Sequence, residues 1–129
     1  KNSFSNLINL NEIDLSNNCL FFLHKELFSN LKYLSVLNLE KNLLKKIDLN
    51  FDNIRNLKLS DNVIYEFKLN DSKKNLNYLD LSQNKFLKRL RLNSLNLNGL
   101  NLFRNFDLNL SNKLDDFKFL NEFISSNLK

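Results

Sequence analysis

The chain has 129 residues, of which 43% are hydrophobic and 26% charged, and its formal net charge is +5. This length suits a single domain covering residues 1–129, and we expect no membrane insertion because no apolar run is long enough to cross a bilayer. One Gly and no Pro argue against a sandwich of tight hairpins, whose turns depend on such residues.

The first two stretches of the chain repeat one another. The segment that begins at Phe4 reads FSNLINLNEIDLSNNCL, and the segment that begins at Phe28 reads FSNLKYLSVLNLEKNLL, 24 positions later. Their leucines, isoleucines and asparagines fall in the same places. Such a repeat indicates a stack of similar turns, because a single turn cannot bury its own apolar side.

An asparagine holds the same position in five successive units, at spacings of 24, 20, 22 and 21 residues. These residues are Asn18, Asn42, Asn62, Asn84 and Asn105. The repeats span about residues 4–20, 28–44, 54–64, 76–86 and 97–107, and the last has Asp107 where an apolar residue is expected. Since an amide side chain both donates and accepts hydrogen bonds, we predict an asparagine ladder that satisfies backbone groups of its own and the neighbouring turn.

The shared frame, L-x-x-L-x-L-x-x-N-x-L, resembles the leucine-rich repeat. The resemblance implies an α/β solenoid, a right-handed superhelix of about five repeats with parallel strands on its concave side. The paired leucines of each unit flank one residue of a strand and therefore point to the same side, into a common core. Leu15, Leu39, Leu59 and Leu81 should then lie over one another in adjacent rows.

The segments that return from one strand to the next differ in length and pattern. Ile47-Asp48-Leu49 and Phe67-Lys68-Leu69 alternate, which predicts short extended segments on the convex wall, whereas the other returns are expected to be irregular. Between Leu87 and Leu102 the leucines are so dense that the repeat register stays open, and a unit starting at Leu92 is an alternative.

The two ends raise separate expectations. Residues 112–129 fit either an amphipathic helix that acts as a C-terminal cap or an atypical last repeat. At the other end the chain starts within a repeat. We therefore expect Phe4, Leu7 and Leu10 to be exposed, or to be covered by missing upstream repeats or a cap.

The residues offer little for catalysis. His24 is the only histidine and lies in a return segment, and no carboxylate has the phase to join it to Cys19 as a triad. Cys19 alone forms neither an internal disulfide nor a metal cluster, and we expect it to be half-buried. No phosphate loop or cofactor motif occurs, so the sequence predicts a protein that is not an enzyme, with no cofactor and no metal.

The remaining candidate is the exposed side of the strands, the surface that repeat proteins use for binding. Tyr78 and Phe103 are its large aromatic residues, and Arg104 and Asp80 supply charge beside them. The predicted partner-binding residues on this concave face are Asp14, Asn38, Lys58, Tyr78, Asp80, Asn101, Phe103 and Arg104.

Charge along the chain does not favour nucleic-acid binding, which needs basic residues gathered on one face. The predicted concave face is close to neutral. The surplus positive charge is expected in dispersed positions of the return segments, at Lys45, Lys46, Lys73, Lys74, Lys88, Arg89 and Arg91.

The resemblance implies a non-catalytic module that recognises a protein ligand. The alternative is a regulatory or substrate-selecting fragment of a larger multidomain signalling enzyme. The longer first return segment, with its Leu27-Phe28, resembles extracellular repeats, so a secreted or cell-surface location is slightly favoured. The partner and the oligomeric state stay open.

Overall fold

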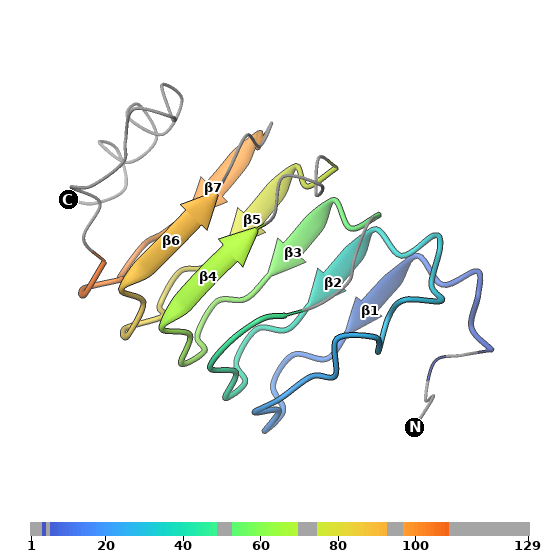
Figure 1. The fold of residues 1–129 in the computed structure, drawn as a ribbon, viewed down its shortest axis with the longest axis horizontal. Coiled ribbons are helices and arrows are strands. Elements are labelled where there is room, and N and C mark those ends of the chain that lie inside the picture. Colours follow the sequence, from blue (N-terminus) through green and yellow to red (C-terminus); the bar gives the residue numbers. More distant parts are fainter. Residues whose placement is uncertain (1–3, 5, 49–52, 70–74, 93–96, 109–129) are drawn as a thin grey trace.

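The computed structural model describes residues 4, 6–48, 53–69, 75–92 and 97–108. These residues form strands joined by turns and bends, and they contain no helix (Figure 1). The strands are β1 (Glu12–Asp14), β2 (Val36–Asn38), β3 (Asn56–Lys58), β4 (Glu66–Leu69), β5 (Tyr78–Asp80), β6 (Arg89–Leu92) and β7 (Gly99–Asn101).

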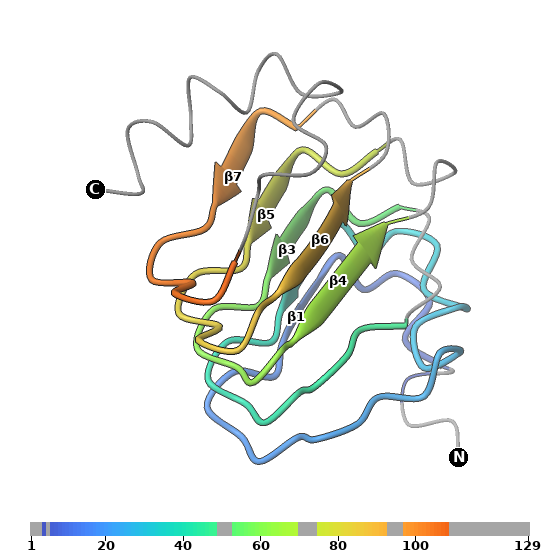
Figure 2. The same cartoon turned by 60° about the vertical axis from the view of Figure 1, so that its left-hand side comes forward.

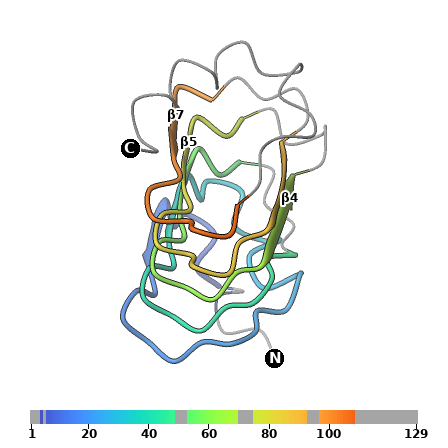
Figure 3. The same ribbon diagram turned by 90° about the vertical axis from the view of Figure 1, so that its left-hand side faces the viewer.

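One parallel sheet gathers a strand from every repeat, in the order β1-β2-β3-β5-β7. Its register places equivalent residues opposite one another, for example Leu37 opposite Leu57 and Leu57 opposite Leu79. The chain therefore advances by one strand with each turn. Seen along the stack in Figure 3, these turns lie over one another, so the solenoid prediction is confirmed.

A second, two-stranded parallel sheet lies across the core from the first and consists of β4 and β6 (Figure 2). Phe67 and Leu69 point inward and are almost fully buried, as the alternating pattern Phe67-Lys68-Leu69 predicts. The similar pattern at Ile47 and Asp48 does not form a strand, and Leu49 lies outside the described residues. Among the described residues, the outer wall thus forms paired strands at β4 and β6 and not at Ile47 and Asp48.

Leucines from both walls fill the interior. The middle residue of each main-sheet strand is buried. Leu39, Leu59 and Leu81, which come directly after strands β2, β3 and β5, are also in the core and are 0% exposed. The predicted superposition holds, because the amides of Leu15, Leu39, Leu59 and Leu81 each donate to a carbonyl of the next turn at 2.8–2.9 Å. Each fully buried leucine contributes about 1.5–3 kcal/mol.

Three expectations need correction or completion. The α/β class is wrong for the described residues, because each repeat is only 20–24 residues long and its described return segment consists of bends or of strand β4 or β6. The open register resolves with Leu92 at the end of β6 and a fresh repeat at Leu97, which precedes β7. The proposed cap over residues 112–129 lies outside the described residues.

The expectation of exposed apolar side chains at the first turn of the stack is met for only one of the three residues named. Leu7 is 48% exposed, and Phe4 and Leu10 are half-buried against the core. Asp107, the irregular residue of the fifth repeat, is also exposed. Phe86 holds the equivalent position in the preceding turn and is 55% exposed, so this position faces solvent in the last two turns.

A left-handed residue stands immediately before every asparagine of the ladder, a feature that the sequence frame did not predict. Asn17, Lys41, Asp61, Gln83 and Arg104 have φ between 53° and 59°. This conformation costs an ordinary residue roughly 1–2 kcal/mol, and Asn tolerates it best. It turns the chain out of the main sheet, so each repeat stores some strain at the same corner.

Replacing Lys41 by valine is therefore expected to lower the free energy of unfolding by about 1–2 kcal/mol, because β-branched residues fit this region worst. Lys58→Val is the matched control, since Lys58 lies in strand β3, where valine is favoured. Its effect should stay within about 0.5 kcal/mol. Urea denaturation measures both, and equal losses would contradict the assignment of strain to residue 41.

Candidate binding face

The side chains that point away from the core along β1, β2, β3, β5 and β7 form a surface that we call the five-strand face. Its middle row is the set predicted from the sequence: Asp14, Asn38, Lys58, Asp80 and Asn101, which the strand register aligns. The structure therefore brings these predicted residues together in one line across the sheet.

Four of these five residues also have a structural task that the sequence analysis missed. A side-chain oxygen of each accepts a hydrogen bond from the backbone amide two residues later. The pairs are Asp14 with Ser16 at 2.8 Å, Asn38 with Glu40 at 3.1 Å, Asp80 with Ser82 at 2.8 Å and Asn101 with Phe103 at 3.1 Å. This local motif is characteristic of Asn and Asp, and here it ends the strand.

Neighbours within the row also bind each other. Asn38 Nδ2 donates to Asp14 Oδ2 at 3.2 Å, and Asn101 Nδ2 donates to Asp80 Oδ2 at 3.2 Å. Hydrogen bonds from the Ser16 hydroxyl and amide lower the pKa of Asp14, and the Lys58 charge acts in the same direction. Lys58 has no side-chain oxygen to accept an amide, and it lies in the row between the Asp14–Asn38 pair and the Asp80–Asn101 pair.

The C-terminal half of the face contains a positioned aromatic ring. Tyr78 lies against Gly99 on the neighbouring strand, and a Cβ added to Gly99 would come within 2.7 Å of Tyr78 Cδ2. The only glycine of the chain is thus the residue that allows the ring to rest on β7. The Tyr78 hydroxyl donates to Asp80 Oδ2 at 3.4 Å, which ties the ring to the row.

Phe103 and Arg104 follow β7 at the rim of the face. The Arg104 guanidinium carbon is 5.0 Å from the centre of the Phe103 ring, within the range of a cation–π contact. Phe103 is 44% exposed, and Arg104 is exposed as well. The pair therefore presents an apolar ring and a positive charge to solvent just beyond the end of β7, whereas Tyr78 lies at the start of the paired strand β5.

Tyr78 should make stability depend on pH in the alkaline range. Burial, followed by the nearby Asp80 charge, raises the pKa of Tyr78 above the ordinary 10.0. The unfolded chain thus releases this proton first, so the stabilising effect is complete below pH 10 and is lost as pH rises through the folded pKa. We expect Tyr78→Phe to lose less stability than the wild type above pH 10 in urea titrations; identical declines would contradict the assignment.

The asparagine ladder is a structural site that joins successive turns. Asn42, Asn62 and Asn84 are buried, and the Nδ2 of each donates to carbonyls of its own and the preceding turn. Their Oδ1 atoms accept the amides of Leu20, Leu44 and Ile64 in the preceding turn at 3.0–3.1 Å. The ladder prediction is confirmed for these three residues.

The two ends of the ladder differ from its centre. Asn18 is exposed and donates only within its own turn, to the carbonyls of Leu15 and Ser16. Asn105 is buried and donates to the Leu102 carbonyl at 2.9 Å, but its Oδ1 has no hydrogen-bond partner. Elsewhere in the ladder, the amide two residues after one asparagine donates to the Oδ1 of the next. After Asn84 the chain instead makes a tight bend, closed by the Leu87 amide on the Asn84 carbonyl.

The remaining reactive side chains of the described residues form no further site. The described ranges hold no group of three or more His, Cys, Asp or Glu side chains that could bind a metal ion. Cys19 is exposed, not half-buried as expected, because its turn follows the exposed Asn18 at the end of the stack. His24 Nδ1 accepts the Glu26 amide at 3.3 Å. No helix in the described ranges is long and apolar enough to span a bilayer.

Comparisons with family models, curated proteins and solved structures gave no match for this chain. The class that the fold defines is a parallel β-solenoid.

Proposed function

We propose that this chain is a non-catalytic module that recognises a protein partner through the five-strand face. The observation that carries the proposal is the arrangement around Tyr78. An aromatic ring is held on Gly99, and the adjacent Asp80 carboxylate is fixed by Ser82, Asn101 and Tyr78 itself.

Interfaces concentrate their energy in a few aromatic and arginine side chains. Tyr78, Phe103 and Arg104 are residues of that kind. Tyr78 begins strand β5, and Phe103 and Arg104 follow the end of the paired strand β7. Groups that are ordered before binding lose less entropy in the complex. Tyr78 meets this condition because its ring rests on a neighbouring strand and its hydroxyl has a hydrogen-bond acceptor.

We further propose that the module is a leucine-rich repeat domain. The support is the repeated L-x-x-L-x-L-x-x-N-x-L frame, together with one strand per repeat and an asparagine after each strand. Protein recognition is the work that this resemblance implies, and fold alone does not assign a partner.

The test immobilises the chain and compares the proteins that it captures from an extract with those captured by variants. Tyr78→Ala/Phe103→Ala removes both rings. Gly99→Ala keeps Tyr78 but moves its ring from β7. Partners of the five-strand face should be lost by the first variant and reduced at least about tenfold by the second, since interface aromatics contribute about 2 kcal/mol or more.

Tyr33→Ala is the matched control, because Tyr33 is 65% exposed and lies outside the five-strand face. It should retain the same proteins as the wild type. Capture that depends on Tyr33 but not on Tyr78 or Phe103 would refute the proposed face, and so would capture unchanged in every variant.

A further inference from the structure

A row of exposed apolar side chains follows the asparagine ladder along the stack. Each turn contributes at least one residue after its ladder asparagine. The row, which we call the apolar ridge, consists of Phe21, Phe22, Leu43, Tyr65, Phe86 and Phe106, with exposed fractions of 74%, 66%, 50%, 39%, 55% and 72%. Isolated exposed apolar residues are ordinary, but large apolar side chains exposed after the asparagine in every successive turn indicate a contact surface.

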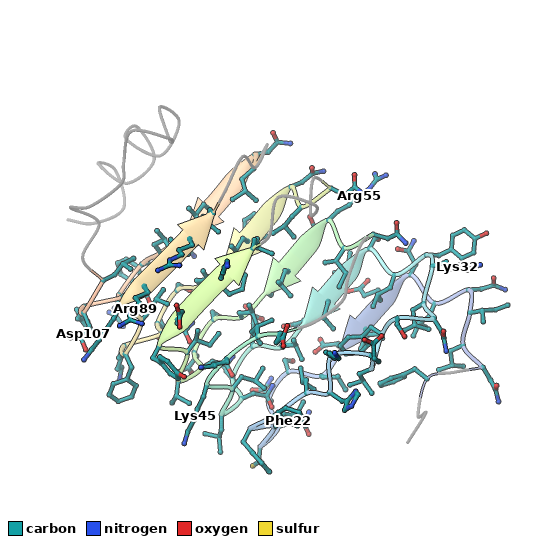
Figure 4. The ribbon with its side chains drawn as sticks, viewed as in Figure 1. Phe22, Lys32, Lys45, Arg55, Arg89 and Asp107 are labelled. Carbon is teal, nitrogen blue, oxygen red and sulfur yellow. The ribbon has the colours of Figure 1, made fainter. Side chains whose placement is uncertain are left out.

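Backbone hydrogen bonds hold the segments of the ridge side by side. The Leu43 amide donates to the Leu20 carbonyl at 2.8 Å, the Tyr65 amide to the Lys45 carbonyl at 3.3 Å, and the Lys88 amide to the Tyr65 carbonyl at 3.0 Å. In Figure 4 Phe22, Lys45, Arg89 and Asp107 lie along one edge of the molecule. Lys32 and Arg55 lie along the opposite edge.

Basic side chains accompany the ridge. Lys45, Lys46, Lys85 and Lys88 are exposed in the same turns, and Lys46 Nζ is 5.1 Å from the centre of the Tyr65 ring. The adjoining outer faces of β4 and β6 add Lys68, Arg89 and Arg91. In the second to fifth turns the described acidic residues of this wall are Asp48, Glu66 and Asp107, so seven positive charges face three negative ones there. The return segment of the first turn adds one charge of each sign, Lys25 and Glu26.

The five-strand face, by contrast, is close to neutral. Glu12, Asp14, Glu40, Asp61 and Asp80 stand against Lys41, Arg55, Lys58 and Arg104 among its described residues. The sequence alone suggested dispersed positive charge. The pairing of β4 with β6 instead gathers much of it on the wall next to the apolar ridge.

Phe, Tyr and Leu side chains flanked by lysines match the boundary between lipid headgroups and acyl chains. Apolar side chains there leave water while the lysines stay at the anionic headgroups. A single nucleic-acid strand fits less well: Leu43 has no ring for base stacking, and Glu66 and Asp48 interrupt the path of basic residues. We propose that the apolar ridge docks this protein on an anionic membrane surface.

The surface contact leaves the five-strand face free, so protein recognition and membrane docking are compatible. The ridge needs no bilayer-spanning segment, because only side chains in the turns enter the interface. The proposal rests on other residues than the proposed function, and either one can fail alone.

The test is sedimentation of the 129-residue chain with vesicles of phosphatidylcholine, with and without phosphatidylserine. We expect binding to the anionic vesicles that weakens with added salt, and much weaker binding to the neutral ones. Phe22→Ser/Phe86→Ser/Phe106→Ser should weaken anionic binding at least about tenfold, since each ring loses part of its transfer free energy. Tyr33→Ser, at an exposed ring next to Lys32, is the control and should bind as the wild type.

A second comparison, between glutamine substitutions at exposed lysines, tests the contribution of positive charge to vesicle binding. Lys45→Gln/Lys88→Gln should weaken binding about fivefold for each charge removed, whereas Lys32→Gln should have no effect. Absence of binding to anionic vesicles would overturn the proposal. So would tight binding to single-stranded DNA that ignores the three phenylalanine substitutions while vesicles are not retained, because the basic wall would then serve nucleic acid.

Discussion

Replacing Asn62 by alanine is expected to lower the free energy of unfolding by about 3–4 kcal/mol. Its Nδ2 donates to the carbonyls of Leu39 at 2.9 Å, Leu59 at 3.1 Å and Ser60 at 3.3 Å. Its Oδ1 accepts the Leu44 amide at 3.0 Å. Alanine leaves these buried backbone groups without partners, at about 1–3 kcal/mol each before any water enters. Urea denaturation of wild type and variant measures the loss.

The same substitution elsewhere in the ladder provides graded controls. Asn105→Ala should cost about 1–2 kcal/mol, because Asn105 Oδ1 has no partner to lose. Asn18→Ala should cost less than about 1 kcal/mol, because Asn18 is exposed and water replaces its bonds. Equal losses at the three positions would show that the contacts between turns do not carry the stabilisation.

The periodic part of the fold follows from the sequence because every repeat obeys the same local rule. Ile13, Leu37, Leu57, Leu79 and Leu100 stand at the same place in the frame, and the structure stacks them in adjacent strands. The asparagine after each strand was predicted for the same reason. What recurs at one period in the sequence must recur at one place in a solenoid.

The return segments were less predictable, because their residues do not recur. Ile47 and Phe67 share an alternating pattern, but only Phe67 lies in a strand, since only Glu66–Leu69 finds a partner of matching register in Arg89–Leu92. Pairing depends on the neighbouring return as well as on the segment itself. The gathering of Arg89 and Arg91 beside Lys68 follows from that pairing and has no local signal.

The sequence predicts the side of the sheet on which the candidate residues lie, but not the contacts that they make there. Strand alternation placed Tyr78 and Asp80 on the side that faces away from the core, but the structure leaves Asp80 only 9% exposed, because Ser82, Asn101 and Tyr78 contact its carboxylate. The role of Gly99 beneath Tyr78 depends on residues 21 positions apart that meet only when β5 and β7 are paired in register. The amide contacts of Asp14 and Asp80 had a recognisable signal, since Asp or Asn two residues before a turn is typical of such motifs.

Leu57→Ala is expected to lower the free energy of unfolding by about 3–5 kcal/mol, the upper part of the range for buried leucines. Leu57 is 0% exposed, lies in the central strand β3 and has Leu37 and Leu79 on its two sides, so neither neighbour can close the cavity without moving its own strand. Leu43→Ala removes the same atoms from a 50% exposed side chain and should change stability by less than about 1 kcal/mol. Urea denaturation compares the two. Because each turn is stabilised only by its neighbours, a small loss at Leu57 would mean that the stack does not unfold as one cooperative unit, and the stability of separate turns would then have to be measured by hydrogen exchange.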